Sequence, residues 1–351
     1  RDLHSFPTRR SSDLDKIRVL LLEGINDSAA ELFAAAGYTN VVRVAKALDR
    51  EALHEALKGT HILGIRSRTQ VTTGLLDAAP ALVAVGCFSV GTNQVDLEAA
   101  RARGIPVFNA PYSNTRSVAE LVIGEIVMLL RRIVPRSVGA HAGEWDKSAT
   151  GSQEVRGKTL GIVGYGNIGS QLSTLAEGMG MRVVFHDQTD KLRHGNTEPT
   201  DSLETLLAQS DVVSLHVPET PETHNMIGEA EIRAMKPGAF LINNARGTVV
   251  DLDALARALR DGHLRGAAVD VFPVEPGSNQ ERFVSPLQGL PNVILTPHIG
   301  GSTEEAQEDI GRFVAAKLRD YIQRGSTTLN VNLPSLNLPE RPGQHRLIHF
   351  H

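Results

Sequence analysis

Short apolar runs alternate with helix-like segments along almost the whole chain from Lys16 onward. The runs at 16–24 and 40–46 read as strands, and the segments at 28–37 and 50–59 have helical spacing and end in glycine. Further strands are expected at 61–67, 81–91 and 105–111. Near-continuous apolar strands separated by helices indicate a parallel sheet that is covered on both faces.

A second series of strands follows a long apolar helix, which is expected at 117–132. This helix is apolar on most of its circumference, which is typical of a helix buried between domains or subunits. Strands of the second series are expected at 158–163, 181–187, 210–218, 240–246, 264–272 and 292–298, and a last helix at 304–325. The pattern therefore predicts an α/β protein with two doubly wound parallel sheets.

Composition narrows the class of protein further. A length of 351 residues suggests about two domains. The net charge of −4 argues against a nucleic-acid binder, which needs a clustered basic surface. The single cysteine, Cys87, excludes an intramolecular disulfide and a thiolate zinc cluster and suits a reducing cytoplasm. Because no apolar run reaches about 18 residues, we expect no membrane span. The expectation is a cytoplasmic protein without a nucleic-acid, membrane or metal partner.

The two ends of the chain do not follow the alternation. Residues 1–14 have no apolar periodicity and lack the apolar stretch of a secretory signal, so we expect a non-native or disordered leader. Residues 332–344 are rich in proline, leucine and asparagine, which suggests a linker. Apolar alternation resumes at 345–351, and we interpret this as the start of a further, missing domain.

A glycine-rich turn marks a dinucleotide site. Gly164, Gly166 and Gly169 stand in G-x-G-x-x-G order, with an apolar strand before them and a helix-like segment after them. In this motif the glycines allow a tight turn, a close approach of the pyrophosphate, and packing of helix on strand. Asp187, at the end of the next strand, can accept hydrogen bonds from ribose hydroxyls and would repel the extra phosphate of NADP. NAD is therefore the expected cofactor.

Three polar residues follow later strands of the same series, where a doubly wound sheet binds its ligand. They are Arg246, Glu275 and His298. An arginine can bind a carboxylate with two parallel hydrogen bonds, and a histidine held by a carboxylate can accept a hydroxyl proton. Each residue alone could be a cap, a turn or a loop residue, but the three together favour oxidation of a 2-hydroxy acid.

These motifs resemble a known family. Four segments are similar to those of the D-isomer-specific 2-hydroxyacid dehydrogenases: GYGNIG, INNARGTVVD, AAVDVFPVEP and LTPHIGG. The resemblance runs from about Lys16 to Leu333. It is most specific, through NAPYSNTRSVAE and HIGGSTEEAQ, for the members that oxidise 3-phosphoglycerate. It implies a Rossmann NAD-binding domain over 114–301, inserted into a flavodoxin-like substrate domain over 15–113 and 302–331.

The resemblance also implies site residues. Arg246, Glu275 and His298 match the catalytic residues of the family. The implied NAD contacts are Gly164, Gly166, Asn167, Ile168, Gly169, Asp187, Asn244, Ala245, Arg246, Asp270, His298, Ile299, Gly300 and Gly301. The implied substrate contacts are Arg66, Ser67, Arg68 and Asn114, of which the two arginines are candidates for binding a phosphate.

The implied reaction is the NAD-dependent oxidation of D-3-phosphoglycerate to 3-phosphohydroxypyruvate, the first step of L-serine biosynthesis. Reduction of 2-oxoglutarate is a side activity that the resemblance allows. A glyoxylate or hydroxypyruvate reductase and an NAD-sensing binding protein of the same fold are the alternatives.

Assembly and regulation follow from the same resemblance. We expect a homodimer or homotetramer. Trp145 is interpreted either as a packing anchor or as part of a loop that, with Lys147, reaches a neighbouring active site. Many relatives continue into a serine-binding ACT domain, which this sequence is expected to lack.

Overall fold

The structure is a computed structural model that describes residues 11–277 and 280–337. The chain separates into two compact units, which we call unit 1 (Arg1–Asn114 and Glu304–His351) and unit 2 (Thr115–Thr303). Each unit has its own sheet and its own hydrophobic clusters. No helix among the described residues is long and apolar enough to span a membrane.

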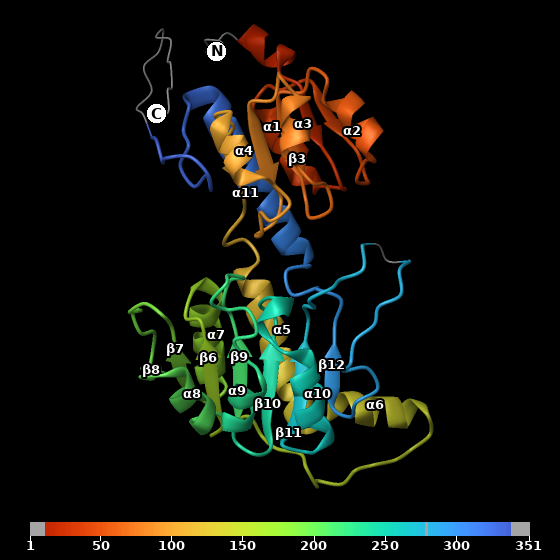
Figure 1. The fold of residues 1–351 in the computed structure, drawn as a ribbon, viewed down its shortest axis with the longest axis vertical. Helices are drawn as coiled ribbons and strands as arrows, with labels where there is room; N and C mark the ends of the chain where they lie inside the picture. The colour runs from red at the N-terminus through yellow and green to blue at the C-terminus, as the bar shows by residue number, and fades with distance from the viewer. Residues whose placement is uncertain (1–10, 278–279, 338–351) are drawn as a thin grey trace. The chain divides into compact units, whose positions relative to one another are not determined.

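Unit 1 is built on a parallel sheet of five strands in the order β2-β1-β3-β4-β5, the flavodoxin-like order (Figure 1). Its strands are β1 (Val19–Leu21), β2 (Val41–Arg43), β3 (Ile62–Ile65), β4 (Ala84–Cys87) and β5 (Val107–Phe108). They are shorter than the apolar runs of the sequence. The flanking residues of each run continue into the loops that follow, and it is these loops that carry the polar residues of the unit.

Helices cover both faces of this sheet, as the apolar strands predict. They are α1 (Asp27–Ala35), α2 (Arg50–Leu57), α3 (Thr73–Asp77), α4 (Leu97–Ala102) and α11 (Glu304–Arg324). One cluster packs α2, α3 and α4 on one face through residues such as Leu57 and Leu76. The other packs α1 and α11 on the opposite face through Phe33 and Leu318. Helix α11, from the far end of the chain, therefore completes the core of unit 1.

The segments near the two ends are partly attached to unit 1. A 3₁₀ helix occupies Ser11–Lys16, and Leu14 packs against the cluster of α1 and α11. Asn332 accepts a hydrogen bond from the Val107 N–H and donates one to the Ile105 carbonyl, at 2.9 Å each. Parts of the expected leader and of the expected linker are thus ordered against unit 1. The remainder of both segments, 1–10 and 338–351, lies outside the described residues.

Unit 2 contains a parallel sheet of seven strands in the order β12-β11-β10-β9-β6-β7-β8. The strands are β6 (Thr159–Val163), β7 (Arg182–His186), β8 (Glu198–Pro199), β9 (Val212–Leu215), β10 (Ala239–Asn243), β11 (Leu264–Val269) and β12 (Val293–Leu295). The first strand, β6, has β7 on one side and β9 on the other, so the order reverses there. This is the Rossmann arrangement, and the predicted α/β fold with two doubly wound sheets is confirmed.

The helices of unit 2 form two layers. They are α5 (Thr115–Arg131), α6 (Ile133–His141), α7 (Asn167–Gly178), α8 (Leu203–Gln209), α9 (Glu229–Ala234) and α10 (Leu252–Arg260); Gly247–Val249 forms a 3₁₀ turn. Helices α8, α9 and α10 pack on one face of the sheet through residues such as Leu207 and Leu255. Helices α5 and α7 pack on the other through Ile126 and Leu172.

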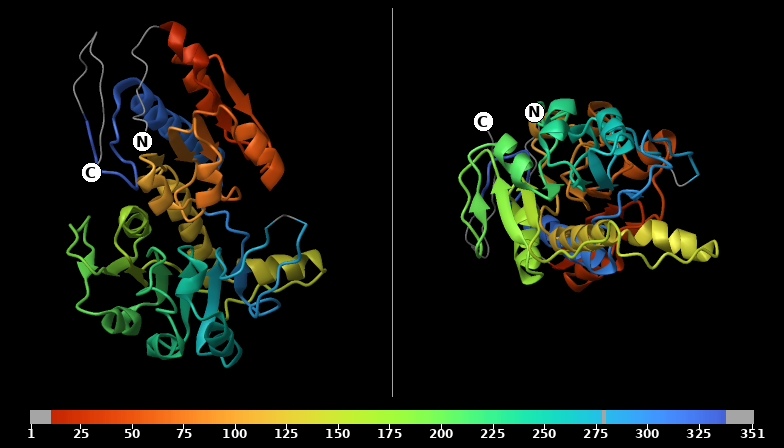
Figure 2. Two further views of the ribbon diagram at one scale, coloured as in Figure 1. Left: turned by 45° about the horizontal axis from the view of Figure 1, so that its top comes forward. Right: turned by 90° about the horizontal axis from the view of Figure 1, so that it is seen from below.

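Helix α6 has no buried residue and, with the loop after it, extends away from the sheet of unit 2 (Figures 1 and 2). Val138 on this helix is 64% exposed, and Trp145 in the loop is 87% exposed. A packing anchor would be buried within its own chain. Trp145 therefore does not act as one in this structure.

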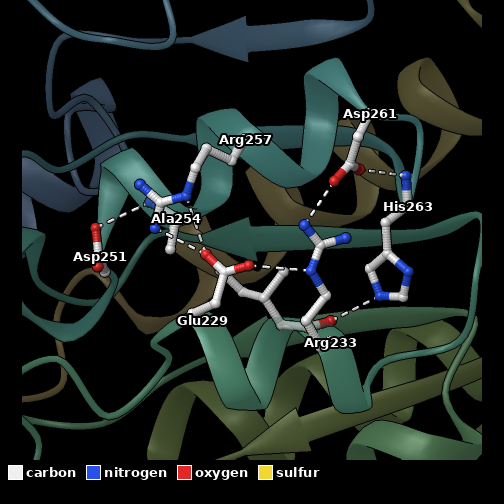
Figure 3. A network of polar contacts seen from close by, with 8 residues as sticks. Glu229, Arg233, Asp251, Ala254, Arg257, Asp261 and His263 are labelled. Atoms are coloured by element: carbon white, nitrogen blue, oxygen red, sulfur yellow. Dashed lines mark hydrogen bonds and ion pairs between the residues drawn. The ribbon is translucent and has the colours of Figure 1, made fainter.

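A surface network of charges joins α9 to α10 (Figure 3). The carboxylate of Glu229 accepts hydrogen bonds from Arg233 at 3.0 Å and from Arg257 at 2.7 Å, and Arg233 also pairs with Asp261. The His263 ring lies 2.9 Å from the Ile232 carbonyl. Exposed ion pairs contribute little individually, but a network fixes the mutual position of the two helices on their face of the sheet.

Candidate active site

The glycine-rich turn has the geometry that a dinucleotide requires. Gly164 has a φ of +91°, and a Cβ there would lie 2.6 Å from the His216 carbonyl oxygen. A Cβ on Gly169 would lie 2.3 Å from the Gly164 carbonyl oxygen, so helix α7 packs directly on the turn. A Cβ on Gly166, in contrast, would meet nothing within 4 Å. The side of the turn that a pyrophosphate would approach is therefore open.

The N-terminus of α7 is free of a capping side chain. At the start of several other helices, a capping side chain accepts a hydrogen bond from a backbone N–H. These capping residues are Asn26, Asp49, Thr72, Asp96, Ser202 and Asp251. Gly166, the N-cap of α7, offers no side chain, and Asn167 and Ile168 form the first turn. Backbone N–H groups at an uncapped helix start bind anions, so this turn fits the phosphates of NAD.

Asp187 follows β7 and faces the same turn. Its Oδ2 accepts a hydrogen bond from the Tyr165 N–H at 2.8 Å, and its Oδ1 accepts from the Thr189 N–H at 3.0 Å. Burial opposes ionisation, but these hydrogen bonds and nearby Lys191 hold the pKa of Asp187 below its usual value. The carboxylate is thus ionised beside the glycine-rich turn, as an acceptor for ribose hydroxyls must be.

The three catalytic candidates follow three neighbouring strands. Arg246 comes after β10, Glu275 after β11 and His298 after β12, and these strands lie side by side in the sheet. The Nδ1 atom of His298 lies 2.9 Å from Oε2 of Glu275. Because Nδ1 is engaged by the carboxylate, Nε2 is the ring atom left to exchange a proton with a substrate.

The electrostatics of this pair suit proton transfer. The hydrogen bond and charge of Glu275 raise the pKa of His298 above its usual value, although burial opposes the shift. Burial alone would raise the pKa of Glu275, but the hydrogen bond and charge of His298, with Arg246 nearby, hold it below its usual value. The imidazolium form of His298 is therefore stabilised by an ionised carboxylate.

Asp270 fixes the segment that carries the histidine. This residue is 1% exposed, and its carboxylate accepts hydrogen bonds from the Thr296 hydroxyl at 2.6 Å, the Ile299 N–H at 2.8 Å and the Gly300 N–H at 2.8 Å. The His298 N–H donates to the Asp270 carbonyl at 2.8 Å. His298 itself has a φ of +54°, which is unusual for a residue with a side chain. Asp270 and its partners hold this conformation.

Arg246 is positioned by the segment before it. Asn243 donates from its side chain to the Arg246 carbonyl at 3.0 Å and accepts from the Ala245 N–H at 3.1 Å. The Arg246 guanidinium donates to the Ala245 carbonyl at 2.6 Å. Within the described residues this guanidinium forms no ion pair, so its charge is available for an anionic substrate.

Sequence reasoning missed a buried acid next to these residues. Glu125 on α5 is 0% exposed, and its Oε2 accepts a hydrogen bond from the Asn244 side chain at 2.9 Å. Burial raises the pKa of Glu125 to about 8; the Asn244 hydrogen bond lowers it in part and the Asp270 charge raises it further. The signal was present in the sequence, because Glu125 stands in helical register with Val118 and Val122 on the buried face.

The substrate-binding candidates belong to unit 1. Arg66 and Ser67 follow β3 directly; Arg66 is half-buried, while Ser67 and Arg68 are exposed. Asn114 is the last residue of the unit before α5 and is half-buried. Neither arginine side chain forms an ion pair in the part of the chain that the structure describes.

Comparison with known proteins places this architecture in a family. The profile of the D-isomer specific 2-hydroxyacid dehydrogenase, NAD binding domain, matches residues 123–300. The chain belongs to the D-isomer-specific 2-hydroxyacid dehydrogenases. The predicted family and the prediction of an NAD-type dehydrogenase are thereby confirmed.

Relatives within the family are similar over most of their length. The chain is 60% identical to the D-3-phosphoglycerate dehydrogenase of Haemophilus influenzae and 57% identical to that of Escherichia coli strain K12, in each case over 97% of this chain and 83% of the relative. Among solved structures, the D-lactate dehydrogenase of Aquifex aeolicus complexed with NAD and lactic acid matches with a TM-score of 0.79 and 29% identity. That match covers 91% of this chain and all of the other.

Proposed function

We propose that this protein oxidises D-3-phosphoglycerate to 3-phosphohydroxypyruvate with NAD, the first step of L-serine biosynthesis. One observation carries the chemistry: His298 and Glu275 lie 2.9 Å apart on loops that follow adjacent strands, with Arg246 on the next. The identity of 57–60% to D-3-phosphoglycerate dehydrogenases supports the choice of substrate.

In the proposed mechanism, Arg246 binds the substrate carboxylate through its guanidinium group, with the two parallel hydrogen bonds that this planar group can make. His298 accepts the hydroxyl proton at Nε2 as the C–H and O–H bonds break and the C=O bond forms. Glu275 stabilises the imidazolium produced in that step. NAD, when bound, supplies the acceptor for the hydride.

The proposed NAD site combines Gly164–Gly169 for the pyrophosphate with Asp187 for the ribose. Residues 244–246, Asp270 and His298–Gly301 are proposed to line the nicotinamide end. The open side of Gly166 and the uncapped start of α7 support the phosphate part of this assignment. The residues of unit 1 that are proposed to bind the substrate are Arg66, Ser67, Arg68 and Asn114. Of these, Arg66 is proposed to contact the phosphate.

A substrate panel tests the proposal. Purified protein is assayed with NAD and D-3-phosphoglycerate, D-glycerate, D-lactate and D-2-hydroxyglutarate, with the ketone product trapped to pull the reaction forward. We expect the highest kcat/KM with D-3-phosphoglycerate and measurable but lower activity with 2-hydroxyglutarate. A preference for glycerate, with glyoxylate or hydroxypyruvate reduced faster in the reverse direction, would replace the proposal by the reductase alternative. No turnover of any substrate would favour an NAD-binding protein.

We also propose that the protein acts in the cytoplasm as a homodimer or homotetramer whose contact includes α6 and the loop after it. Helix α6 has no buried residue, and Trp145 is 87% exposed, so a second copy of the chain would cover an apolar surface there. Lys147 in the same loop would then approach the neighbouring copy. Analytical ultracentrifugation of the parent and of Val138→Glu tests this, and a parent that sediments as a monomer would contradict it.

A further inference from the structure

Buried polar side chains gather at the carboxyl ends of the strands in unit 1. Glu23 is 8% exposed, Thr69 4%, Gln94 8% and Asn109 8%. Glu23 lies after β1, Thr69 after β3, Gln94 after β4 and Asn109 after β5. Burying a polar group costs free energy unless it is hydrogen-bonded, so the partners of Glu23 and Gln94 show which groups these two side chains hold.

Glu23 holds the backbone of the loop that carries Arg66 and Arg68. Its Oε2 accepts a hydrogen bond from the Arg68 N–H at 2.9 Å, and its Oε1 accepts one from the Thr69 N–H at 2.9 Å. Both oxygens therefore bind consecutive backbone N–H groups. A glutamine could not replace this pair, since its NH₂ group would face a second donor.

The backbone at Glu23 is itself unusual. Its φ is +62°, a conformation that residues with side chains adopt rarely. Gly24, next to it, has a φ of +63°. A glycine would suit position 23 better by conformation alone. The carboxylate contacts to Arg68 and Thr69 are the visible compensation for this strain.

Gln94 holds the same loop from the other side. Its Nε2 donates to the Arg66 carbonyl at 2.6 Å and to the Ser89 hydroxyl at 3.2 Å. Its backbone carbonyl accepts from the Val71 N–H at 2.8 Å. The segment from Arg66 to Val71 is thus attached at four backbone groups, two by Glu23 and two by Gln94.

We propose that Glu23 and Gln94 are positioning residues that fix the Arg66–Thr69 backbone so that Arg66 meets the phosphate of the substrate. The proposal rests on the proposed function, which assigns Arg66 to the phosphate. Neither positioning residue contacts the substrate in this account. Arg66 has no ion-pair partner of its own among the described residues, so the direction of its side chain depends on the backbone that Glu23 and Gln94 hold.

Steady-state kinetics of Glu23→Gln and Gln94→Met test the proposal. Contacts to a phosphate remote from the reacting carbon act mainly on binding, so we expect KM for D-3-phosphoglycerate to rise at least about ten-fold while kcat changes less than about three-fold. KM for NAD and kcat/KM for D-lactate should stay within about two-fold, because neither ligand uses the phosphate contact. Glu98→Gln, the same charge change on an exposed residue of α4, is the matched control and should behave as the parent.

Two further variants separate positioning from general loss of structure. Glu23→Gly removes the carboxylate but suits the φ of +62°, so it should fold while still raising KM for D-3-phosphoglycerate. In an Arg66→Ala background, Glu23→Gly should add little, since both changes remove the same contact. Amide hydrogen exchange of the peptide covering residues 66–71 should accelerate in Glu23→Gly and in Glu23→Gln, but not in Glu98→Gln.

Three outcomes would overturn the proposal: KM for D-3-phosphoglycerate within two-fold of the parent in both Glu23 variants, full additivity with Arg66→Ala, or unchanged exchange over 66–71. The substrate panel distinguishes this failure from failure of the proposed function. If the parent turns over D-3-phosphoglycerate preferentially and the Glu23 variants are unaffected, the reaction stands and the positioning role falls. If the parent does not use D-3-phosphoglycerate, the phosphate role of Arg66 falls with the proposed function.

Discussion

Glu275→Gln should move the pH dependence of the reaction in a defined direction. In the parent, Glu275 raises the pKa of His298, so the neutral base needed for oxidation forms only at higher pH. Removing the carboxylate charge lowers the pKa of His298. The rising limb of kcat/KM for oxidation should then move to lower pH, and the falling limb for ketone reduction, which needs the imidazolium, should move the same way.

The size of this effect follows from the geometry. A unit charge pair at 2.9 Å interacts by about 1.4 kcal/mol at the dielectric constant of water. The side chains of His298 and Glu275 are 51% and 37% exposed, so this water-like value is the appropriate lower estimate. An interaction of that size is worth about ten-fold in a protonation equilibrium. At a pH above the pKa of His298, where the imidazolium is the minor form, ketone reduction should therefore fall at least about ten-fold in Glu275→Gln.

The assay is kcat/KM in both directions between pH 5 and 10, for the parent, Glu275→Gln and Glu281→Gln. The last variant makes the same charge change further along the same loop, where the carboxylate accepts a hydrogen bond from the Gly277 N–H. It should reproduce the parent profile. Two results would refute the assignment of the titrating group to the His298–Glu275 pair. One is a pH profile of Glu275→Gln that coincides with that of the parent, and the other is a profile of Glu281→Gln that shifts as much as that of Glu275→Gln.

Three other changes probe the rest of the site. Asp187→Ala should lose preference for NAD over NADP by roughly ten-fold or more in the ratio of kcat/KM values, because the repelling carboxylate is gone; a parent that uses both cofactors equally would contradict this role. Arg246→Lys should lower kcat/KM for every 2-hydroxy acid by about ten-fold or more, since charge remains but the paired hydrogen bonds are lost; full activity would remove Arg246 from carboxylate binding. Glu125→Gln should make the free energy of unfolding depend less on pH. The raised pKa of Glu125, about 8, makes the parent lose stability as pH rises from about 4.5 to 8, by up to about 1.4 kcal/mol per pH unit. Identical denaturation curves of both proteins across that range would contradict this prediction.

The sequence was sufficient to predict the alternation of strands and helices, because buried parallel strands leave long apolar runs such as the one at 158–163. It did not predict β8, Glu198–Pro199, whose two residues are both exposed and carry no apolar signal. Strand bounds were also overestimated. The run at 16–24 contains only three paired residues, since β1 pairs with both neighbours over Val19–Leu21 and Glu23 then turns away with positive φ.

At the site, glycines and strand-end polar residues could be found from spacing alone, as Gly166 and His298 illustrate. Contacts between residues distant in sequence could not, even where, as for Glu125, helical register marks the residue as buried. The Asn244 side chain and Glu125 are 119 positions apart, and Glu23 lies 45 positions from the Arg68 N–H that it binds. No local sequence pattern predicts such pairs, because the two groups of each pair are brought together only when the sheet forms.

We expect hydride to leave the α-carbon of a D-2-hydroxy acid for NAD while His298 takes the hydroxyl proton. The most direct measurement uses D-3-phosphoglycerate deuterated at that carbon, with mass spectrometry of the reduced cofactor. We expect deuterium in the nicotinamide product and a primary isotope effect on the chemical step of a single turnover. In His298→Ala the rate of deuterium transfer should fall roughly 100-fold or more. Deuterium released to solvent instead, or transfer at the parent rate in His298→Ala, would contradict it.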